Sequence, residues 1–492
     1  MLPLLAAGWL AYQHVGSGFM PHMDEGGFIL DYVSPPGTSL TETDRLLRQV
    51  EGIIERNPWV ATYSRRTGTQ LGGGVTEANE GDFFIRLKPF PRPPIERVMD
   101  QIRTQVEQQV PGLDIELAQL MEDLIGDLTA VPQPIEIKIY SDNAKQLRSL
   151  ARKVEDAIGK VPGVVDTNNG IHPAGDALEI HVDRVKAALE GVDPEAVTRL
   201  LEGYLGGTVT TRIQSGPKLI GVRVWTPKSL RSTTRDIGAL PLRAPDGHVF
   251  PLSRVASVVA VNGQPQITRE NLKRMVAVTG RISGRDLGSV IRDVKRVMAR
   301  PGMLPKGVYY ELGGLYKQQQ IAFRGLAAVF AAAVALVFLL LLFLYESFRV
   351  ALAILAIPLL AVSAVFIGLW VTGIELNISA MMGMTMIIGI VTEVAIFYFS
   401  EYHDLAAGPD RHAALIEAGK NRMRPIAMTT FAAILTLLPL AFAIGQGSAM
   451  QQPLAVAIIA GLAVQLPLVL LVMPALFVML RGGTGHGAQA AR

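Results

Sequence analysis

Five long hydrophobic runs fill the last third of the chain and constrain its fold more than any other feature. They cover residues 325–344, 350–371, 378–400, 425–445 and 453–480. Each run has the roughly 20 residues that a helix needs to cross a bilayer. Because lipid offers no partners to backbone N–H and C=O groups, we expect five transmembrane helices over residues 325–480.

Basic residues next to these runs predict which side of the membrane each end faces. Lys or Arg follows the first, third and fifth runs, whereas residues 372–377 and 445–452 carry neither. The positive-inside rule therefore puts the basic connections, and a tail over residues 481–492, in the cytoplasm. Residues 13–324 are then expected on the opposite, periplasm-like side.

The first twelve residues are apolar but too few to span the bilayer. They lack the basic start and the small-residue cleavage site of a signal peptide. We interpret residues 1–12 as the end of a spanning helix that begins further upstream, so we expect the chain to be truncated.

Residues 13–324 alternate between strand-like and helix-like hydrophobic periods. Over residues 13–133 four strand patterns and two helix patterns follow one another in the order β-α-β-β-α-β. The strand patterns cover residues 27–33, 59–64, 82–87 and 113–118. This order is typical of a split, ferredoxin-like unit.

A second unit of the same kind is predicted over residues 134–183 and 273–315. Residues 184–272 interrupt it as an insertion with its own short helix and strands. The predicted fold class is therefore an α+β membrane protein, in which two ferredoxin-like units stand beside a helix bundle. Two such units side by side form a natural ligand cleft.

Glu393 is an acidic residue inside the otherwise uncharged run 378–400. A carboxylate at bilayer depth is costly and usually marks an ion or proton path. Its neighbours on one helix face, Met386, Gly389 and Phe397, form an apolar setting that favours the neutral form. Glu393 is therefore the candidate protonation site.

The glycine-rich stretch 65–82 is long for a connection between two strands. It is interpreted either as a loop that gates a ligand or as a plain connector. Four polar side chains in or next to it are candidates for substrate binding, although solvated surface positions would look the same. They are Tyr63, Arg65, Arg66 and Gln70.

Few features favour other functions. The chain has no cysteine, and its net charge of +3 is spread out, so neither thiol chemistry nor a nucleic-acid partner is indicated. His22, Asp24 and Glu25 would suit a metal ion, but a polar turn leaving the membrane explains them better, and we predict no metal site. No nucleophile-base pair indicates an enzyme.

Three segments resemble the C-terminal half of resistance-nodulation-division efflux permeases. They are FMPHMDEGGFILDYVSPPGTSLTETDR (19–45), GIVTEVAIF (389–397) and NRMRPIAMTTFAAILTLLPLAFAIGQGSAMQQPLAVAIIAGL (421–462). The resemblance implies two porter subdomains, with residues 184–272 as a docking subdomain. It also implies a homotrimeric inner-membrane transporter that works with a periplasmic adaptor and an outer-membrane channel.

The resemblance implies energy from the proton-motive force and no cofactor. Thr429 and Arg422 match relay positions of the family, and Glu393 takes the place where many multidrug members carry a lysine. Efflux of small organic or amphiphilic compounds is the main expectation for the cargo. Heavy-metal cations on the same scaffold, or a fragment that does not transport, are the alternatives.

Overall fold

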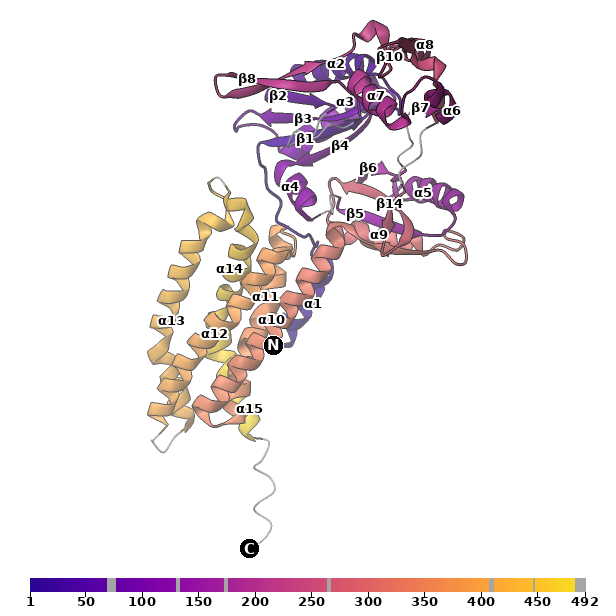
Figure 1. Cartoon of the computed structure of the whole chain (residues 1–492). Coiled ribbons are helices and arrows are strands. Elements are labelled where there is room, and N and C mark those ends of the chain that lie inside the picture. Colours follow the sequence, from indigo (N-terminus) through magenta and orange to yellow (C-terminus); the bar gives the residue numbers. More distant parts are fainter. Residues whose placement is uncertain are drawn as a thin grey trace.

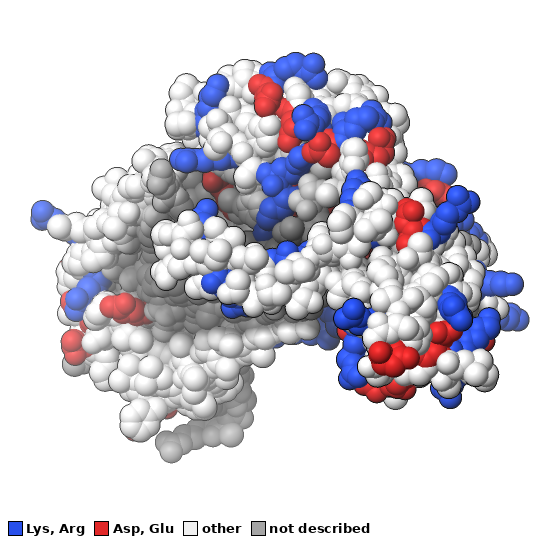
Figure 2. All heavy atoms as spheres, turned by 45° about the horizontal axis from the view of Figure 1, so that its top comes forward, with Lys and Arg blue, Asp and Glu red and all other residues white. Residues whose placement is uncertain are grey.

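A computed structural model describes residues 1–68, 77–129, 133–171, 176–262, 267–406, 411–445 and 447–482. An α/β part stands above a bundle of long helices, and the chain's last described helix ends at the far side of the bundle (Figure 1). Lys and Arg are interspersed with Asp and Glu over the α/β part, with more Lys and Arg than Asp and Glu on the face shown in Figure 2.

The first α/β unit has the predicted element order. Its elements are β1 (Gly27–Val33), α2 (Leu40–Arg56), β2 (Val60–Thr67), β3 (Glu80–Leu87), α3 (Ile95–Gln109) and β4 (Asp114–Gln119). The antiparallel strands lie in the order β2-β3-β1-β4. Alternate residues of β1, Phe28, Leu30 and Tyr32, are buried in one core with the apolar faces of α2 and α3. A helix that was not predicted, α4 (Leu120–Thr129), follows β4.

The second α/β unit repeats this arrangement with a delayed second half. It comprises β5 (Ile135–Tyr140), α5 (Ala144–Ile158), β6 (Val164–Asn168), β14 (Lys273–Ile282), α9 (Leu287–Met298) and β15 (Tyr309–Leu312). β14 pairs with β5 and β6, and β15 pairs with β5, so the order β6-β14-β5-β15 matches that of the first unit. A short strand, β13 (Arg269–Glu270), adds to β14.

The insertion begins earlier than predicted. We expected its start at residue 184, but β7 (Asp176–Val182) pairs along its length with β12 (Ala256–Asn262), at the other end of the insertion. That boundary is wrong because strand periodicity identifies a strand without identifying its partner. Between them lie α6 (Arg184–Leu189), α7 (Pro194–Gly206), β8 (Thr208–Ser215), β9 (Lys218–Val224), η1 (Lys228–Leu230), α8 (Thr234–Gly238), β10 (Pro241–Arg243), β11 (Val249–Pro251) and η2 (Leu252–Arg254).

Five helices of the described chain are long and apolar enough to cross a membrane, as predicted. They are α10 (Gly314–Tyr345), α11 (Phe348–Thr372), α12 (Ile378–Leu405), α13 (Arg411–Ala441), and α14 (Gln452–Pro467) continued through η4 (Leu468–Val472) into α15 (Met473–Gly482). The short helix η3 (Ser448–Met450) precedes α14. α10 and α13 begin well before their predicted starts, because hydropathy does not detect their polar first turns.

Small residues let the helices of the bundle approach closely. A Cβ on Gly383 of α12 would lie 2.9 Å from Cβ of Ala457 on α14. The N-terminal helix α1 (Leu2–His14) packs along α11, where a Cβ on Gly8 would lie 2.5 Å from Cβ of Ser363. α11, α12 and α14 form the interior of the bundle, whereas α10 and α13 turn most of their apolar surface outward.

Candidate functional site

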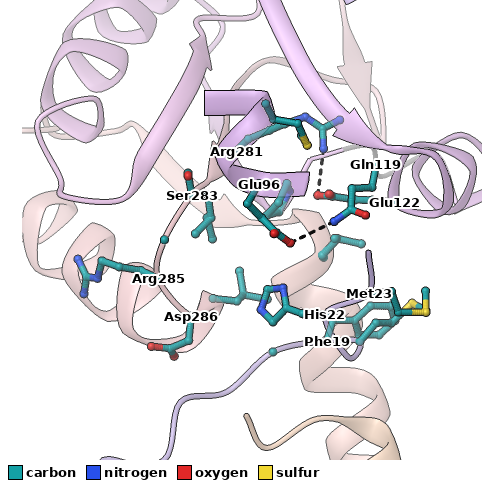
Figure 3. Close-up of a pocket in the computed structure, with 18 of the residues that line it drawn as sticks. Phe19, His22, Met23, Glu96, Gln119, Glu122, Arg281, Ser283, Arg285 and Asp286 are labelled. Atoms are coloured by element: carbon teal, nitrogen blue, oxygen red, sulfur yellow. Dashed lines mark hydrogen bonds and ion pairs between the residues drawn. The ribbon is translucent and has the colours of Figure 1, made fainter. Parts of the chain in front are cut away.

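A cleft of about 560 Å³ opens between the two α/β units. The segment from α1 to β1, the helix α3, the β4–α4 corner and the β14–α9 connection contribute its lining. Glu96 and His22 point toward the same space in Figure 3, whereas Arg285 and Asp286 point away from it. The cleft is where the fold brings the two units, the first connecting segment and the helix bundle together.

Residues 16–22, here called the strap, fix the lower edge of the cleft to the helices. Leu376, between α11 and α12, donates its N–H to Gly16 O at 2.8 Å, and Gly18 N–H donates to Leu376 O at 3.1 Å. The buried amide of Gln319 on α10 donates to Gly18 O at 2.8 Å. Gly288 N–H of α9 donates to the O of residue 17 at 2.9 Å. One short segment therefore joins three membrane helices to the second α/β unit.

His22 ends the strap at the mouth of the cleft. Its Nε2 lies 3.2 Å from Oε1 of Glu375, which stands in the same α11–α12 connection. The hydrogen bond to Glu375 raises the pKa of His22, so the charged imidazolium is favoured there. The imidazole side chain is 71% exposed, so protons reach it freely.

Carboxylates outnumber guanidinium groups around the cleft. The acidic lining residues are Glu25, Glu96, Asp100, Glu122, Asp286 and Glu375, and the arginines are Arg103, Arg281 and Arg285. Burial, with Glu122 and Asp24 nearby, raises the pKa of Glu25, which accepts a hydrogen bond from Met121 N–H at 2.8 Å. The cleft therefore attracts cations more than anions.

Arg103 and Asp166 bridge the two units behind the cleft. Nε of Arg103 on α3 donates to Oδ1 of Asp166 at 2.7 Å, and a second guanidinium nitrogen donates to Oδ2 at 3.0 Å. Leu117 N–H of β4 also donates to Oδ2 of Asp166, at 3.1 Å. The two side chains are 8% and 1% exposed, so this is a buried, bidentate ion pair.

Arg281 makes a second bridge from β14 to the β4–α4 corner. Its guanidinium lies 2.5 Å from Oε1 of Glu116 and 2.9 Å from Oε1 of Glu122. Only 4% of the Arg281 side chain is exposed. Glu122 lines the cleft whereas Glu116 lies on the strand behind it, so Arg281 stands between the cleft and the open face of the first sheet.

That open face carries a row of carboxylates that sequence analysis missed. Asp31 on β1 is the register partner of Asp82 on β3 and of Glu116 on β4, so the three side chains share one face. Burial, together with Asp123, Glu116 and Asp82, raises the pKa of Asp31 to about 7. A charged residue at the centre of an apolar strand was the available signal, but only the strand order shows what lies beside it.

The predicted substrate-binding residues do not act together in the structure. Arg65 and Arg66 alternate along β2: Arg65 pairs with Asp44 on α2, and Arg66 with Asp82 across the sheet. The hydroxyl of Tyr63 donates to Oε1 of Glu55 at 2.8 Å. None of these three side chains lines the cleft, and Gln70 lies outside the described residues.

The predicted relay residues are also apart. Glu393 is exposed on α12, and its carboxylate forms no hydrogen bond or ion pair with any residue that the structure describes. Thr429 donates to the carbonyl of Ile426 in its own helix at 3.0 Å. Arg422 pairs with Glu401 near the end of α12 at 2.8 Å. These contacts leave the proposed relay without a direct link between its members.

His22, Asp24 and Glu25 diverge, as expected for a polar turn. Asp24 pairs with Arg92 and accepts the N–H of Ile95 at 3.0 Å, far from the partner of His22. In the described ranges, no three His, Asp or Glu side chains are close enough to hold a metal ion.

The chain is similar to several bacterial resistance proteins. It is 27% identical over 453 residues to the cobalt-zinc-cadmium resistance protein CzcA of Cupriavidus metallidurans, which covers 89% of this chain and 42% of that protein. The nickel and cobalt resistance protein CnrA of the same organism is 29% identical over 464 residues, which covers 91% of this chain and 43% of that protein. This chain therefore spans less than half the length of these relatives.

The fold is similar to a solved structure as well. A crystal structure of a heavy metal efflux pump superimposes with a TM-score of 0.81 and 26% identity, over 98% of this chain and 50% of that one. A model of the AcrB/AcrD/AcrF family matches residues 1–481. Because this match runs through both α/β units and all five spans, the chain belongs to the AcrB/AcrD/AcrF family of resistance-nodulation-division permeases.

Proposed function

We propose that the chain forms the C-terminal half of a proton-driven transporter that exports a heavy-metal cation. Two relatives are named for resistance to cobalt, zinc, cadmium or nickel, and a third, in Escherichia coli, is named a cation efflux system protein. The acidic lining of the cleft suits such a cargo better than the organic compounds expected from the sequence.

The carboxylate row is the observation that carries the metal proposal. Asp82 is paired with Arg66 and Glu116 with Arg281, whereas Asp31 between them has no ion-pair partner in the part of the chain that the structure describes. A half-buried carboxyl beside two carboxylates is stabilised in its charged form by a cation. Carboxylate oxygens are among the ligands that Zn²⁺ accepts. In this structure the three carboxylates are not close enough to coordinate one ion together, so the row is proposed to attract a cation and to gather around it only after a movement of the strands.

We propose that the Arg281 guanidinium occupies the position of the cargo cation between transport cycles. Its guanidinium joins Glu122, in the cleft, to Glu116, in the row. A divalent ion that entered the cleft would compete with Arg281 for both carboxylates. Movement of β14 against β4 would then release the ion from one set of ligands to the other.

The membrane helices are proposed to drive this movement through the strap. Protonation of Glu393 on α12 would shift α12 against its neighbours, and the α11–α12 connection is hydrogen-bonded to the strap below the cleft. Neither Thr429 nor Arg422 contacts Glu393 in this structure. Their proposed role in the relay therefore requires the helices to rearrange during the transport cycle.

The surroundings of the transporter are proposed from the family. We place the helices in the bacterial inner membrane, with residues 13–324 in the periplasm as porter and docking subdomains. A periplasmic adaptor, an outer-membrane channel and two further copies would complete the assembly. The β8–β9 hairpin projects from the insertion, and every residue of β8 is exposed (Figure 1). Exposed apolar side chains on both strands, such as Ile213 on β8 and Leu219 on β9, suit a surface for assembly.

The test is growth of a metal-sensitive host that expresses the full-length transporter. We expect protection against Zn²⁺, Co²⁺, Cd²⁺ or Ni²⁺ to be lost in Asp31→Asn and kept in Glu42→Gln, which alters an exposed carboxylate on α2. Protection against organic compounds but not metals would favour the organic cargo. If neither metals nor organic compounds are exported, both transport proposals fail, and the alternative without transport activity is favoured.

A further inference from the structure

Three polar side chains lie in the interior of the helix bundle without hydrogen-bond partners. Gln465 on α14, Thr430 on α13 and Thr392 on α12 are 1%, 5% and 4% exposed. Neither amide atom of Gln465 and neither threonine hydroxyl bonds to any described residue. An amide offers two donors and one acceptor, so Gln465 is the largest unsatisfied group in the bundle.

Other threonine hydroxyls in the spans donate a hydrogen bond to a backbone carbonyl of their own helix. Thr385 donates to Met381 O at 3.1 Å, and Thr436 to Ala432 O at 2.8 Å. This local bond is open to a threonine in a helix. Thr392 and Thr430 do not form this bond. Their hydroxyls are therefore available to a partner other than the backbone of their own helix.

The register between helices places Gln465 along its neighbours. A Cβ on Gly383 of α12 meets Ala457 of α14, and a Cβ on Gly461, one turn further along α14, meets Ile387, one turn further along α12. The two helices therefore run side by side in the same direction. One more turn along both helices brings Gln465 to the level of residue 391.

Thr392 and Thr430 lie at the same depth. Thr392 is next to residue 391 on α12. α13 runs antiparallel to α14, since Gln452 Nε2 at the start of α14 donates to Ala441 O at the end of α13 at 2.9 Å. Counting back along both helices puts Thr430 within about 3 Å of Gln465 along the bundle axis. The three orphan groups form one polar layer.

The backbone beside Gln465 is also irregular. Pro467 has no N–H to donate, and α14 opens into a wide π-helical turn over Leu468–Val472. Such turns inside α-helices are frequent at functional sites. The distortion and the unsatisfied amide occur within one turn of each other.

We propose that this layer, Gln465 with Thr430 and Thr392, is a water-binding site inside the membrane-spanning bundle. Lipid cannot supply the missing hydrogen bonds, and a buried water makes about three of them. Glu393 follows Thr392 directly, so the site brings water to the depth of that carboxyl. The site itself is independent of the cargo, and only its use as a proton route rests on the proposed function.

Cysteine labelling tests the site directly, because the chain has no cysteine of its own. Gln465→Cys and Thr430→Cys are made in the full-length protein, in which any cysteine outside residues 1–492 is replaced by serine, and are treated with aminoethyl methanethiosulfonate in membrane vesicles. The control is Val365→Cys, since Val365 is fully buried in an apolar cluster of α11, α12 and α14. Only a hydrated thiolate reacts, so we expect rates roughly tenfold or more above the control.

Equal rates at Gln465, Thr430 and Val365 would show a dry interior and overturn the site. Thr430→Cys is nearly isosteric, so it reports even if Gln465→Cys fails to fold. Glu393→Gln separates the two proposals: loss of export with unchanged labelling supports both. Unchanged export with unchanged labelling removes the proton relay and leaves the water site standing.

Discussion

The buried pair of Arg103 and Asp166 is predicted to hold the two α/β units together. Asp166→Asn keeps the shape of the side chain but removes its charge. Asp166 has a φ of 47°, a left-handed conformation that Asn also tolerates, so the backbone is not expected to change. The substitution therefore tests the charge and its three hydrogen bonds alone.

The cost follows from what the substitution leaves behind. The Asn side chain has one oxygen where Asp166 has two, so in either orientation its NH₂ group faces an N–H of the Arg103 guanidinium. Removing one partner of a buried ion pair costs about 3–5 kcal/mol. Arg103 keeps a second carboxylate, Asp100, so we take the lower end, about 3 kcal/mol.

Amide hydrogen exchange measures this cost at the interface. With about 1.4 kcal/mol for each factor of ten, exchange of the peptide over residues 113–119 should accelerate roughly a hundredfold. Glu42→Gln, in an exposed pair on α2, is the control and should leave that peptide unchanged. If both variants exchange at the wild-type rate, the buried pair does not join the units and the reasoning is wrong.

Three further predictions concern the row, the strap and the mouth of the cleft. Because the pKa of Asp31 is about 7 in the fold, wild-type stability should fall as pH rises from 3.8 to about 7, by up to about 4 kcal/mol, and thermal unfolding of Asp31→Asn should lack this slope. Gln319→Leu should lower stability by about 1–3 kcal/mol in the same assay, since Gly18 O loses its donor. Glu375 raises the pKa of His22, so the His22–Glu375 pair should stabilise the strap fully below pH 6.5 and lose this effect as pH rises through the raised pKa. Hydrogen exchange of the strap should accelerate over that pH range in the wild type and not in His22→Gln.

The sequence predicted the spans and the succession of helices and strands in the first unit, because hydrophobic period and length determine these features locally. It did not predict where β7 pairs, since register partners far apart along the chain leave no mark on the strand itself. It also missed the row around Asp31. Three carboxylates that are separated by long stretches of sequence become neighbours only through the order β3-β1-β4.

Which side chains of the candidate site lie together was even harder to predict from the sequence. Arg65 and Arg66 were grouped because they are adjacent in sequence, yet adjacent residues of a strand point to opposite faces. Arg66 does reach the carboxylate row, through Asp82, which the sequence had not singled out. Glu393 stands out in sequence as the acidic residue of an apolar run, but its surroundings depend on the packing of α12 and could not be predicted from that run alone.

The outward face of α12 leads to the last prediction. Met386, Gly389, Glu393 and Phe397 form an exposed stripe, and a Cβ on Gly389 would meet nothing within 4 Å. A carboxylate facing lipid at mid-depth costs about 3 kcal/mol or more. We therefore expect further protein to cover this stripe in the assembled transporter.

Gly389→Leu tests that expectation against Gly325→Leu. Gly325, in α10, also has open space around its Cβ position, and α10 turns most of its surface outward. On lipid, a leucine is favourable or neutral, whereas at a close helix contact its added side chain cannot be accommodated. Gly389→Leu should therefore abolish export and lower the yield of assembled transporter, while Gly325→Leu should leave both near wild type. Equal tolerance of the two leucines would mean that Glu393 faces lipid, where a proton from the aqueous phase could not reach it, and the coupling of this carboxyl to the cleft would have to be abandoned.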